Sequence, residues 1–415
     1  SATEASGASS PPLPPPLPPL NPSEKLVREY LLSNPQFSSS ALGKVQVMTG
    51  RYTNREWAEQ IAETQKKVFE LVELERKQGK RYEVPKIGSE EFARTIDHTL
   101  LKLEATESQI DALCSEARTE GFKSVCVRLN YVPRCISNLK GSTVIVACVV
   151  GFHEGTQDTL LKLEEARAAV AAGASELDIV LNHTILTRTN NPEGVPSQAA
   201  TQGHKRDSTA DTITWKNTEA NSKPQDGTIP AAGPYSVPTS SAPTSSSTPP
   251  DEADISIPDY SAIYTELASL RSLCPPPTTL KLILETSQLT PAQILAAAHL
   301  AAAANFDFIK TSTGFNGPGA KLEDVQLMVA AAEYLSTKTE SNGGSPVRSH
   351  KMQVKASGGI RSLDDAVRML EAGATRLGTS SGLWIMQESR QRLKEGEGGK
   401  KKPALVSRLY TDDSV

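Results

Sequence analysis

Short runs of β-branched and other apolar residues alternate, from Phe92 onward, with alanine- and leucine-rich segments of helical periodicity. The apolar runs predict strands at residues 95–100, 124–128, 144–150, 176–181, 279–285, 306–310, 353–356 and 376–378. The segments that follow them predict helices at residues 107–120, 131–139, 156–172, 260–273, 291–304, 322–335, 363–372 and 382–393. Eight apolar strands, each followed by a helix, favour an α/β fold with a parallel sheet, closed as a (β/α)8 TIM barrel.

Both ends of the chain and one internal segment depart from this alternation. Residues 1–24 consist largely of prolines, small residues and scattered leucines, and predict a disordered tail. Residues 190–257 form a low-complexity insertion that is too long and too polar for an ordinary loop. The insertion interrupts the predicted barrel, residues 89–398, between the fourth strand and its helix, and residues 399–415 form a C-terminal tail.

The segment before the barrel, residues 25–88, is predicted to be a helical N-terminal extension. Within it, Trp57, Ile61, Val68 and Val72 recur at helical spacing with charged residues between them, which predicts an amphipathic helix over residues 55–80. The apolar face of this helix would dock on the barrel or on another copy of the chain. The sequence leaves both arrangements open.

Composition and charge narrow the classes of protein to consider. Because 44 Lys and Arg residues face 48 Asp and Glu residues, the net charge of −4 gives no electrostatic reason to expect a nucleic-acid or membrane partner. Neither an apolar run of about 18 residues nor a signal-peptide pattern is visible, so a cytoplasmic protein is the default expectation, although the chain does not begin with Met. No two of the five cysteines form a C-x-x-C pair, so we predict that they are buried free thiols.

Three ionisable residues stand in or at the end of apolar strands: Asp178 in SELDIVLN, Lys310 in DFIKTSTG and Lys355 in MQVKASGG. In a barrel these strand ends converge on one mouth, so the three side chains are expected to be neighbours. Two ammonium groups held close together disfavour each other's charge, and burial adds to the effect. One lysine can then be a free amine near neutral pH and form a Schiff base with a carbonyl group.

Other ionisable residues are predicted to surround this centre. Lys281 in LKLILET lies earlier in its strand, which favours an ion-pair partner over a nucleophile. Asp97 and His98 in TIDHTLL are candidates for orienting substrate or supporting the centre, and a capping aspartate with a satisfied histidine is an equally good interpretation. Cys126 in SVCVRL is placed in the same supporting layer.

Glycine- and hydroxyl-bearing segments follow the last three predicted strands. Loops at the last two of these positions in a barrel often present backbone N–H groups and a helix N-terminus to a phosphate. The segments therefore predict a phosphate monoester as ligand. The candidate phosphate- or substrate-binding residues are Thr311, Thr313, Gly314, Gly358, Gly359, Gly378, Ser380 and Ser381.

Together, these segments resemble deoxyribose-phosphate aldolases, a family of class I aldolases on a (β/α)8 barrel. The resemblance covers residues 94 to about 385 without the insertion, and it rests on the motifs IDHTLLK, GFKSVCV, VVGF, AAGASELDIVLN, LKLILET, DFIKTSTGF, VKASGGIRSLDDA and EAGATRLGTSSG, in the family's order.

The resemblance implies a lyase that reversibly cleaves 2-deoxy-D-ribose 5-phosphate into D-glyceraldehyde 3-phosphate and acetaldehyde, in deoxyribonucleotide catabolism. It implies that Lys310 forms the Schiff base, that Lys355 perturbs the pKa of Lys310, and that Asp178 joins the proton relay. It also implies that the Gly358-Gly359 and Ser380-Ser381 segments hold the phosphate. No metal or cofactor is expected.

The chain departs from the family's pattern in three respects. His153 and Glu154 in VVGFHEG stand where family members commonly carry Pro and a small or apolar residue. The insertion and the N-terminal extension are atypical. Tyr410 in RLYTDDSV does not align with the C-terminal tyrosine that some members use in proton transfer.

Two other interpretations stay open from the sequence. One is a metal-dependent aldolase or isomerase that uses His98, His153 and His183, although no H-x-H or H-x-x-x-H spacing supports it. The other is a barrel kept as a scaffold, whose polyproline tail docks in the groove of an SH3-type or profilin-like partner. The sequence does not report the oligomeric state, and a homo-oligomer is one of the arrangements it allows.

Overall fold

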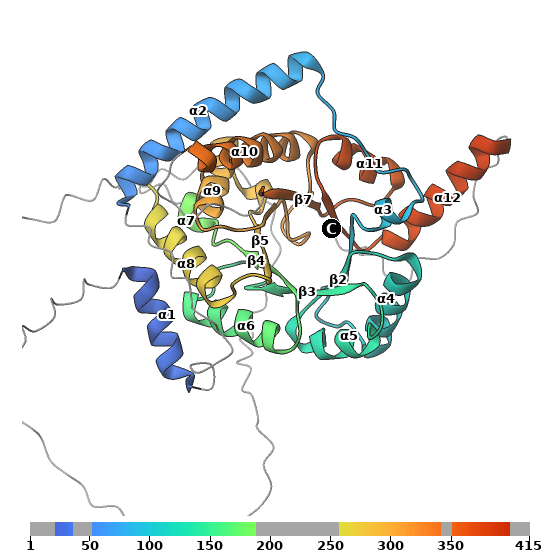
Figure 1. Cartoon of the computed structure of the whole chain (residues 1–415), viewed down its shortest axis with the longest axis horizontal. Coiled ribbons are helices and arrows are strands. Elements are labelled where there is room, and N and C mark those ends of the chain that lie inside the picture. The colour runs from blue at the N-terminus through green and yellow to red at the C-terminus, as the bar shows by residue number, and fades with distance from the viewer. Residues whose placement is uncertain (1–20, 36–51, 188–256, 342–350, 399–415) are drawn as a thin grey trace, which may run out of the picture. The chain divides into compact units, whose positions relative to one another are not determined.

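Parallel strands close into a barrel in the order of the chain (Figure 1), in a computed structural model that describes residues 21–35, 52–187, 257–341 and 351–398. Each strand pairs in parallel with the next, and β8 pairs with β1, so the (β/α)8 prediction is confirmed. The strands are β1 Ile96–Thr99, β2 Ser124–Val127, β3 Ile145–Val150, β4 Glu176–Val180, β5 Thr279–Ile283, β6 Phe308–Lys310, β7 Gln353–Ser357 and β8 Arg376–Thr379.

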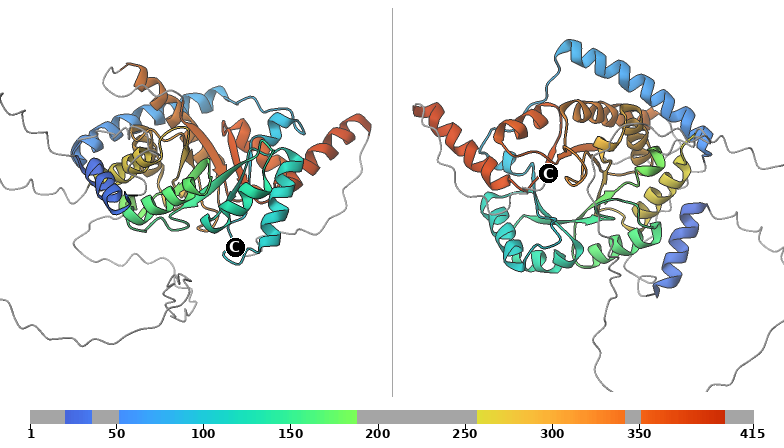
Figure 2. Two further views of the ribbon diagram at one scale, coloured as in Figure 1. Left: turned by 60° about the horizontal axis from the view of Figure 1, so that its bottom comes forward. Right: turned by 180° about the vertical axis from the view of Figure 1, so that it is seen from behind.

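Helices surround the strands, as Figures 1 and 2 show. All predicted helices are present, with ends that differ by a few residues. They are α4 Glu107–Glu120, α5 Val132–Asn138, α6 Thr159–Ala171, α8 Tyr260–Leu273, α9 Pro291–Ala303, α10 Leu322–Ser341, α11 Leu363–Glu371 and α12 Gly382–Gly398. The short helices α3 Glu90–Ala93 and α7 Thr184–Thr187 and the 3-10 turns η2 Leu129–Tyr131 and η3 Thr286–Gln288 add to these.

Local sequence accounts for the ends of these helices. At the start of α4, the Thr106 side chain accepts a hydrogen bond from the Gln109 backbone, and the Gln109 side chain accepts one from the Thr106 backbone. Gly121 ends the same helix with a left-handed φ of 73°, a conformation that glycine adopts without strain. Such caps fix where each helix stops and the next strand begins.

The strands divide their side chains between two environments. In β4, Leu177 and Ile179 belong to the large apolar core between strands and helices, while Glu176 and Asp178 make ion pairs with residues of other strands inside the barrel. This alternation follows from the two-residue period of a strand. A smaller apolar cluster, formed by Leu101, Cys126, Ala147 and Val149, fills the interior on the side of β2 and β3.

The N-terminal extension packs on the barrel helices. Its long helix α2 Asn54–Gln78 contacts α8, α9 and α10 and lies along the outside of the barrel in Figure 1. The described part also contains α1 Pro22–Ser33, which contacts α6 and α8. Because α1 begins at Pro22, the boundary predicted after residue 24 is wrong by three residues: Asn21 caps the helix and Pro22 occupies its first turn.

Aromatic packing holds α2 in place. The Trp57 ring is 4.8 Å from the Tyr264 ring on α8 and 5.9 Å from the His299 ring on α9, measured between centroids. Thr64 Oγ1 lies 2.9 Å from His299 Nδ1 in the same buried contact. The predicted amphipathic helix therefore docks its apolar face on the barrel.

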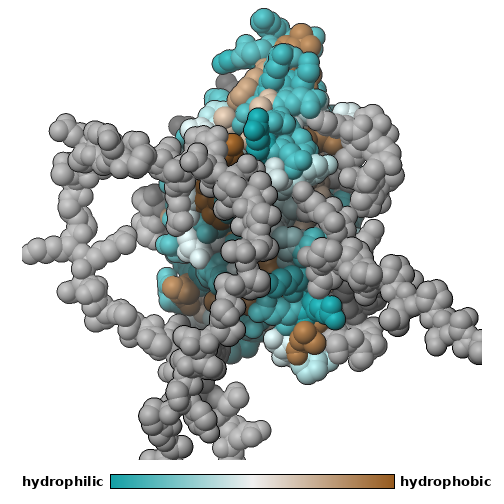
Figure 3. All heavy atoms as spheres, turned by 90° about the vertical axis from the view of Figure 1, so that its left-hand side faces the viewer, coloured by the Kyte–Doolittle hydropathy of each residue, from teal (hydrophilic) through white to brown (hydrophobic). Residues whose placement is uncertain are grey.

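On the part of the face in Figure 3 that is coloured by hydropathy, hydrophilic residues are frequent and the apolar side chains in view are scattered among them. Within the described ranges, no helix is long and apolar enough to cross a membrane. The predicted tails beyond α1 and α12, the insertion up to residue 256 and Tyr410 lie outside these ranges.

We predict that Trp57→Ala lowers the free energy of unfolding by about 3–5 kcal/mol, because it empties a buried site between α2 and the barrel. Phe69→Ala on the same helix is the matched control: Phe69 is 39% exposed, and the change should cost less than about 1 kcal/mol. Urea unfolding followed by circular dichroism measures both values. Equal losses for the two variants would contradict the inferred docking of α2.

Candidate active site

Charged side chains from six neighbouring strands meet inside the barrel. Lys310 at the end of β6 places its Nζ 2.9 Å from Asp178 Oδ2. Lys355 on β7 places its Nζ 2.8 Å from the same oxygen and 2.6 Å from Asp97 Oδ2. The three residues predicted to form the centre are thus brought together, and Asp97 supports them from β1.

A second set of ion pairs lies next to this group. Lys281 Nζ is 2.7 Å from Asp178 Oδ1 and 2.5 Å from Glu176 Oε2. Arg376 Nη1 is 2.7 Å from Asp97 Oδ1 and 3.0 Å from Glu176 Oε2. The position of Lys281 agrees with the predicted ion-pair role. We call the whole set the interior charge cluster; its members are Asp97, Glu176, Asp178, Lys281, Lys310, Lys355 and Arg376.

Glu176 and Arg376 were not predicted from the sequence. Both stand in apolar strands, in SELDIV and TRLGT, and the same reasoning that singled out Asp178 applies to them. Glu176 precedes Asp178 by two residues, so a strand places both side chains on one face. That spacing is the signal that could have identified Glu176 from sequence.

The two lysines nearest the mouth have opposite pKa shifts. Burial lowers the pKa of Lys310; the carboxylate of Asp178 opposes this effect and the charge of Lys355 adds to it. Burial would also lower the pKa of Lys355, but the carboxylates of Asp178 and Asp97 raise it above the ordinary value. Lys355 therefore stays protonated while Lys310 releases its proton more easily.

Both aspartates of the cluster are held ionised. Burial alone would raise the pKa of Asp178, but Lys281, Lys310 and Lys355 together bring it well below the ordinary value. Asp97 behaves in the same way, with Arg376 as the largest charge that opposes burial. The cluster therefore keeps these carboxylates charged at neutral pH.

Cys126 borders the same centre, as predicted. Its Sγ lies 3.9 Å from Asp178 Oδ2. Burial, and then the charge of Asp178, raise the pKa of the Cys126 thiol to about 11, so it stays a neutral thiol. All five cysteines of the chain are free and buried, which confirms the expectation of unpaired thiols.

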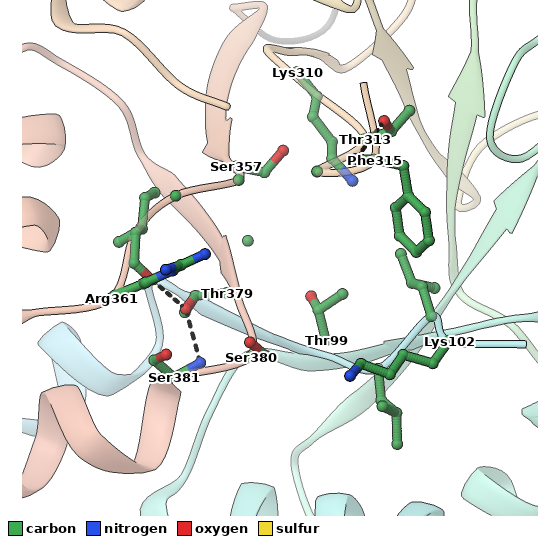
Figure 4. A pocket seen from close by; sticks show the side chains of 17 residues that line it. Thr99, Lys102, Lys310, Thr313, Phe315, Ser357, Arg361, Thr379, Ser380 and Ser381 are labelled. Carbon is green, nitrogen blue, oxygen red and sulfur yellow. Dashed lines mark hydrogen bonds between the residues drawn. The ribbon is translucent and has the colours of Figure 1, made fainter. Parts of the chain in front are cut away.

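A pocket opens above Lys310 at the carboxyl ends of the strands (Figure 4). Lys310 is only 2% exposed, yet it lines this pocket, whereas Lys281 and Lys355 are fully buried and do not. Among these three interior lysines, Lys310 alone can meet a ligand. Residues predicted to bind substrate or phosphate that line the same pocket are Thr313, Gly314, Gly358, Gly359, Gly378, Ser380 and Ser381.

The two predicted phosphate loops follow adjacent strands, β7 and β8, and both line the pocket. Gly358 and Gly359 precede α11, and Ser380 and Ser381 immediately precede α12, so both loops lead into helix N-termini that favour an anion. Thr379 joins the loops: its Oγ1 donates to the Ile360 carbonyl at 2.6 Å and accepts from the Ser381 backbone N–H at 2.9 Å.

Position 378 must be glycine because a side chain there would overlap Lys355. A Cβ atom on Gly378 would lie 2.9 Å from Lys355 Cε and 2.7 Å from Ser357 Cβ. Gly359 has a φ of 73°, and a Cβ there would lie 2.9 Å from the Pro318 carbonyl oxygen. The glycines of these loops therefore serve the packing of the site as well as the approach of a ligand.

Thr311 does not line the pocket, so its predicted role in binding the ligand is corrected. Its side chain is fully buried, donates to the Ser357 carbonyl at 3.0 Å and accepts from the Ser357 backbone N–H at 3.0 Å. It thus joins the ends of β6 and β7 instead of lining the pocket. Thr313 lines the pocket, but its hydroxyl group donates to Glu285, which anchors the loop after β6.

Two cationic residues of the pocket were missed by sequence reasoning. Arg361 and Lys102 extend into it from opposite sides, as Figure 4 shows. Both stand within quoted motifs, VKASGGIRS and IDHTLLK, but an Arg or Lys in a loop is usually a solvated surface residue. The approach of the two loops, which the fold creates, is what directs these side chains to one pocket.

Two of the three histidines considered as metal ligands pack against aromatic rings. His98 is buried against Phe122, and its Nε2 lies 2.7 Å from Glu116 Oε2, whereas its Nδ1 has no hydrogen-bond partner among the described residues, so the interpretation of a satisfied histidine holds for one ring nitrogen alone. His153 stacks on Phe315, with ring centroids 5.2 Å apart and planes 14° apart. Within the described ranges, no group of three or more His, Cys, Asp or Glu residues is arranged to hold a metal ion.

Comparison with known proteins agrees with this geometry. A family model described as DeoC/LacD family aldolase matches residues 267–388, which run from α8 to α12. The deoxyribose-phosphate aldolase of Coccidioides immitis (strain RS) is 37% identical over 309 residues, 74% of this chain and 84% of that protein. The chain belongs to the deoxyribose-phosphate aldolase family. It is a class I aldolase, as the resemblance of its motifs implies.

Other relatives extend the same result. The deoxyribose-phosphate aldolase of Carboxydothermus hydrogenoformans is 35% identical over 301 residues, 72% of this chain and 96% of the relative. A crystal structure described as a deoxyribose-phosphate aldolase from Coccidioides immitis has a TM-score of 0.56 and 34% identity, covering 82% of this chain and 98% of that one. The structure of the aldolase QR15 has a TM-score of 0.50 and 28% identity, covering 73% and 97%.

We predict that Lys355→Met raises the pKa of Lys310, because it removes a neighbouring positive charge and leaves Asp178 Oδ2 to Lys310. Labelling of Lys310 by a small amine reagent, followed by peptide mass spectrometry across a pH series, should shift to higher pH. The control is Lys351→Met, which removes an exposed lysine paired with Glu333. A labelling curve that does not move in Lys355→Met would refute the electrostatic role of Lys355.

Proposed function

We propose that this aldolase reversibly cleaves 2-deoxy-D-ribose 5-phosphate into D-glyceraldehyde 3-phosphate and acetaldehyde, as a step of deoxyribonucleotide catabolism. The observation that carries the proposal is the position of Lys310. A buried lysine with a lowered pKa lies at the floor of a pocket whose far end is built from two anion-favouring loops. One end suits a carbonyl group and the other suits a phosphate.

In the first step, the neutral Nζ of Lys310 attacks C1 of the open-chain sugar. Loss of water from the resulting carbinolamine gives an iminium ion, whose positive charge then resides on the former lysine nitrogen. Burial, and then the fixed ammonium of Lys355 near Asp178, lower the pKa of Lys310 and so favour its neutral amine before the attack. The nucleophile is therefore prepared by charges that the fold holds in place.

In the second step, a base removes the proton from the C3 hydroxyl group and the C2–C3 bond breaks. Its electron pair flows to the iminium nitrogen and forms an enamine, while C3 becomes the aldehyde carbon of D-glyceraldehyde 3-phosphate. Protonation of the enamine at C2 and addition of water release acetaldehyde and restore Lys310. We assign the movement of protons to Asp178, Lys355 and water, because these two residues contact Lys310 or its partner oxygen.

The phosphate is proposed to lie between the Gly358-Gly359 and Ser380-Ser381 segments. Arg361 extends toward this space, and the N-termini of α11 and α12 add partial positive charge. Since the phosphate does not react, its binding energy serves to place C1 beside Lys310.

Trapping experiments identify the nucleophile. Borohydride reduction in the presence of acetaldehyde is expected to add an ethyl group to the peptide that contains Lys310. Lys310→Arg should abolish both this label and the release of acetaldehyde from 2-deoxy-D-ribose 5-phosphate. Undiminished labelling of Lys310→Arg at another residue would disprove the assignment.

Arg361→Ala tests the phosphate end. Loss of a charge-assisted contact costs about 1.5–3 kcal/mol, so KM for the phosphorylated sugar should rise about 10- to 150-fold. Self-condensation of acetaldehyde, which involves no phosphate, should stay unchanged. Arg368→Ala on the exposed side of α11 is the matched control and should affect neither reaction. Equal loss of both reactions in Arg361→Ala would place the phosphate elsewhere.

A further inference from the structure

The interior charge cluster holds more cationic side chains than carboxylates. Its cations are Lys281, Lys310, Lys355 and Arg376, and its carboxylates are Asp97, Glu176 and Asp178. All seven side chains are at least nine-tenths buried, so water screens their charges poorly. With every group ionised, the cluster would carry one positive charge in excess.

The excess is relieved most readily at Lys310. An arginine does not lose its proton in a protein, and Lys281 and Lys355 each lie between two carboxylates within 3 Å. Lys310 shares one oxygen of Asp178 with Lys355, and among the described residues no second carboxylate lies within ion-pair distance of its ammonium group. It is also the member that reaches the pocket.

We propose that Arg376 and Glu176, which do not line the pocket, act as positioning residues that set how easily Lys310 releases its proton. Arg376 makes an ion pair with Asp97, and Asp97 makes one with Lys355. Lys355 and Lys310 both contact Asp178 Oδ2. Glu176 binds both Arg376 and Lys281. The net charge of this chain of contacts, more than any one pair, decides the protonation of the nucleophile.

Other titratable groups around Lys310 do not replace this control. Glu285 lies two residues after β5, where its carboxyl group accepts a hydrogen bond from Thr313, and burial raises its pKa. Cys126 on β2 stays a neutral thiol. The charged or titratable groups that act on Lys310 are Asp178 from β4, Lys281 and Glu285 from the β5 segment, Lys355 from β7 and Cys126 from β2, with Asp97 and Arg376 behind them.

The proposal predicts opposite effects for two single substitutions. Arg376→Met removes the excess positive charge, so Lys310 should keep its proton to higher pH. Glu176→Gln keeps the shape of the side chain but adds to the excess, so Lys310 should lose its proton at lower pH. The double variant restores the original balance, and Arg376→Lys leaves it unaltered, so both should behave like the parent protein.

The test measures the amine of Lys310 directly. Reductive methylation with formaldehyde and cyanoborohydride across a pH series, read by peptide mass spectrometry, reports the fraction of free amine. We expect the labelling curve to move by about one pH unit in each direction, a tenfold change in free amine on the low-pH side of the curve. A merely structural role would lower labelling or stability in both single variants without moving the curves in opposite directions.

Shifts in the same direction, or a double variant that does not return toward the parent, would overturn the proposal. If Arg376→Met does not fold, Glu176→Gln and the double variant still test it, because the second change must move the curve back to higher pH. The inference rests on the proposed Schiff-base role of Lys310, yet different results would reject that role and the charge control. Absence of an acetaldehyde adduct on Lys310 in the parent protein rejects the role, whereas unshifted methylation curves reject the charge control.

Discussion

The interior charge cluster is the constraint on which the barrel and its chemistry both depend. Removing one partner of a buried ion pair typically costs about 3–5 kcal/mol, so every charge placed here needs partners from other strands. Asp97 on β1 reaches Lys355 on β7 and Arg376 on β8, which is possible only when the sheet closes. The charges that prepare Lys310 for reaction thus also favour one register and one closed arrangement of strands.

The cluster divides the barrel interior into an apolar side and a charged side. On the side of β2 and β3, small and apolar residues such as Ala147 and Val149 fill the interior without adding charge. The remaining strands supply the charges, and Lys310 stands where these charges meet the pocket. Since Lys310 is almost fully buried, a ligand that reaches it must leave most of its water behind, which strengthens electrostatic interactions at the reacting carbon.

The sequence was enough to predict the barrel and the positions of Asp178, Lys310 and Lys355, because both leave a recognisable local pattern. Strands and helices differ in the period of their apolar residues, and a charge inside an apolar strand stands out. Arg361 lacks such a contrast, since a charged residue in a loop looks like ordinary surface until the fold brings two loops together. Thr311 was assigned to the ligand because a hydroxyl group looks the same whether it faces a pocket or joins two strands. The boundary between tail and extension was placed too late because proline signals both disorder and a helix N-terminus.

The long insertion shows how one connection of the barrel can lengthen without disturbing the cluster. It enters after α7 and returns before α8, between two strands that both carry charges of the site. The described strands β4 and β5 nevertheless pair without interruption from Glu176 opposite Thr279 to Val180 opposite Ile283. Beyond them, the Leu181 backbone N–H donates to the Ile283 carbonyl at 3.0 Å. The entropy of closing a loop grows only with the logarithm of its length, so side-chain contacts such as Asp178 with Lys281 can hold the register while the connection lengthens.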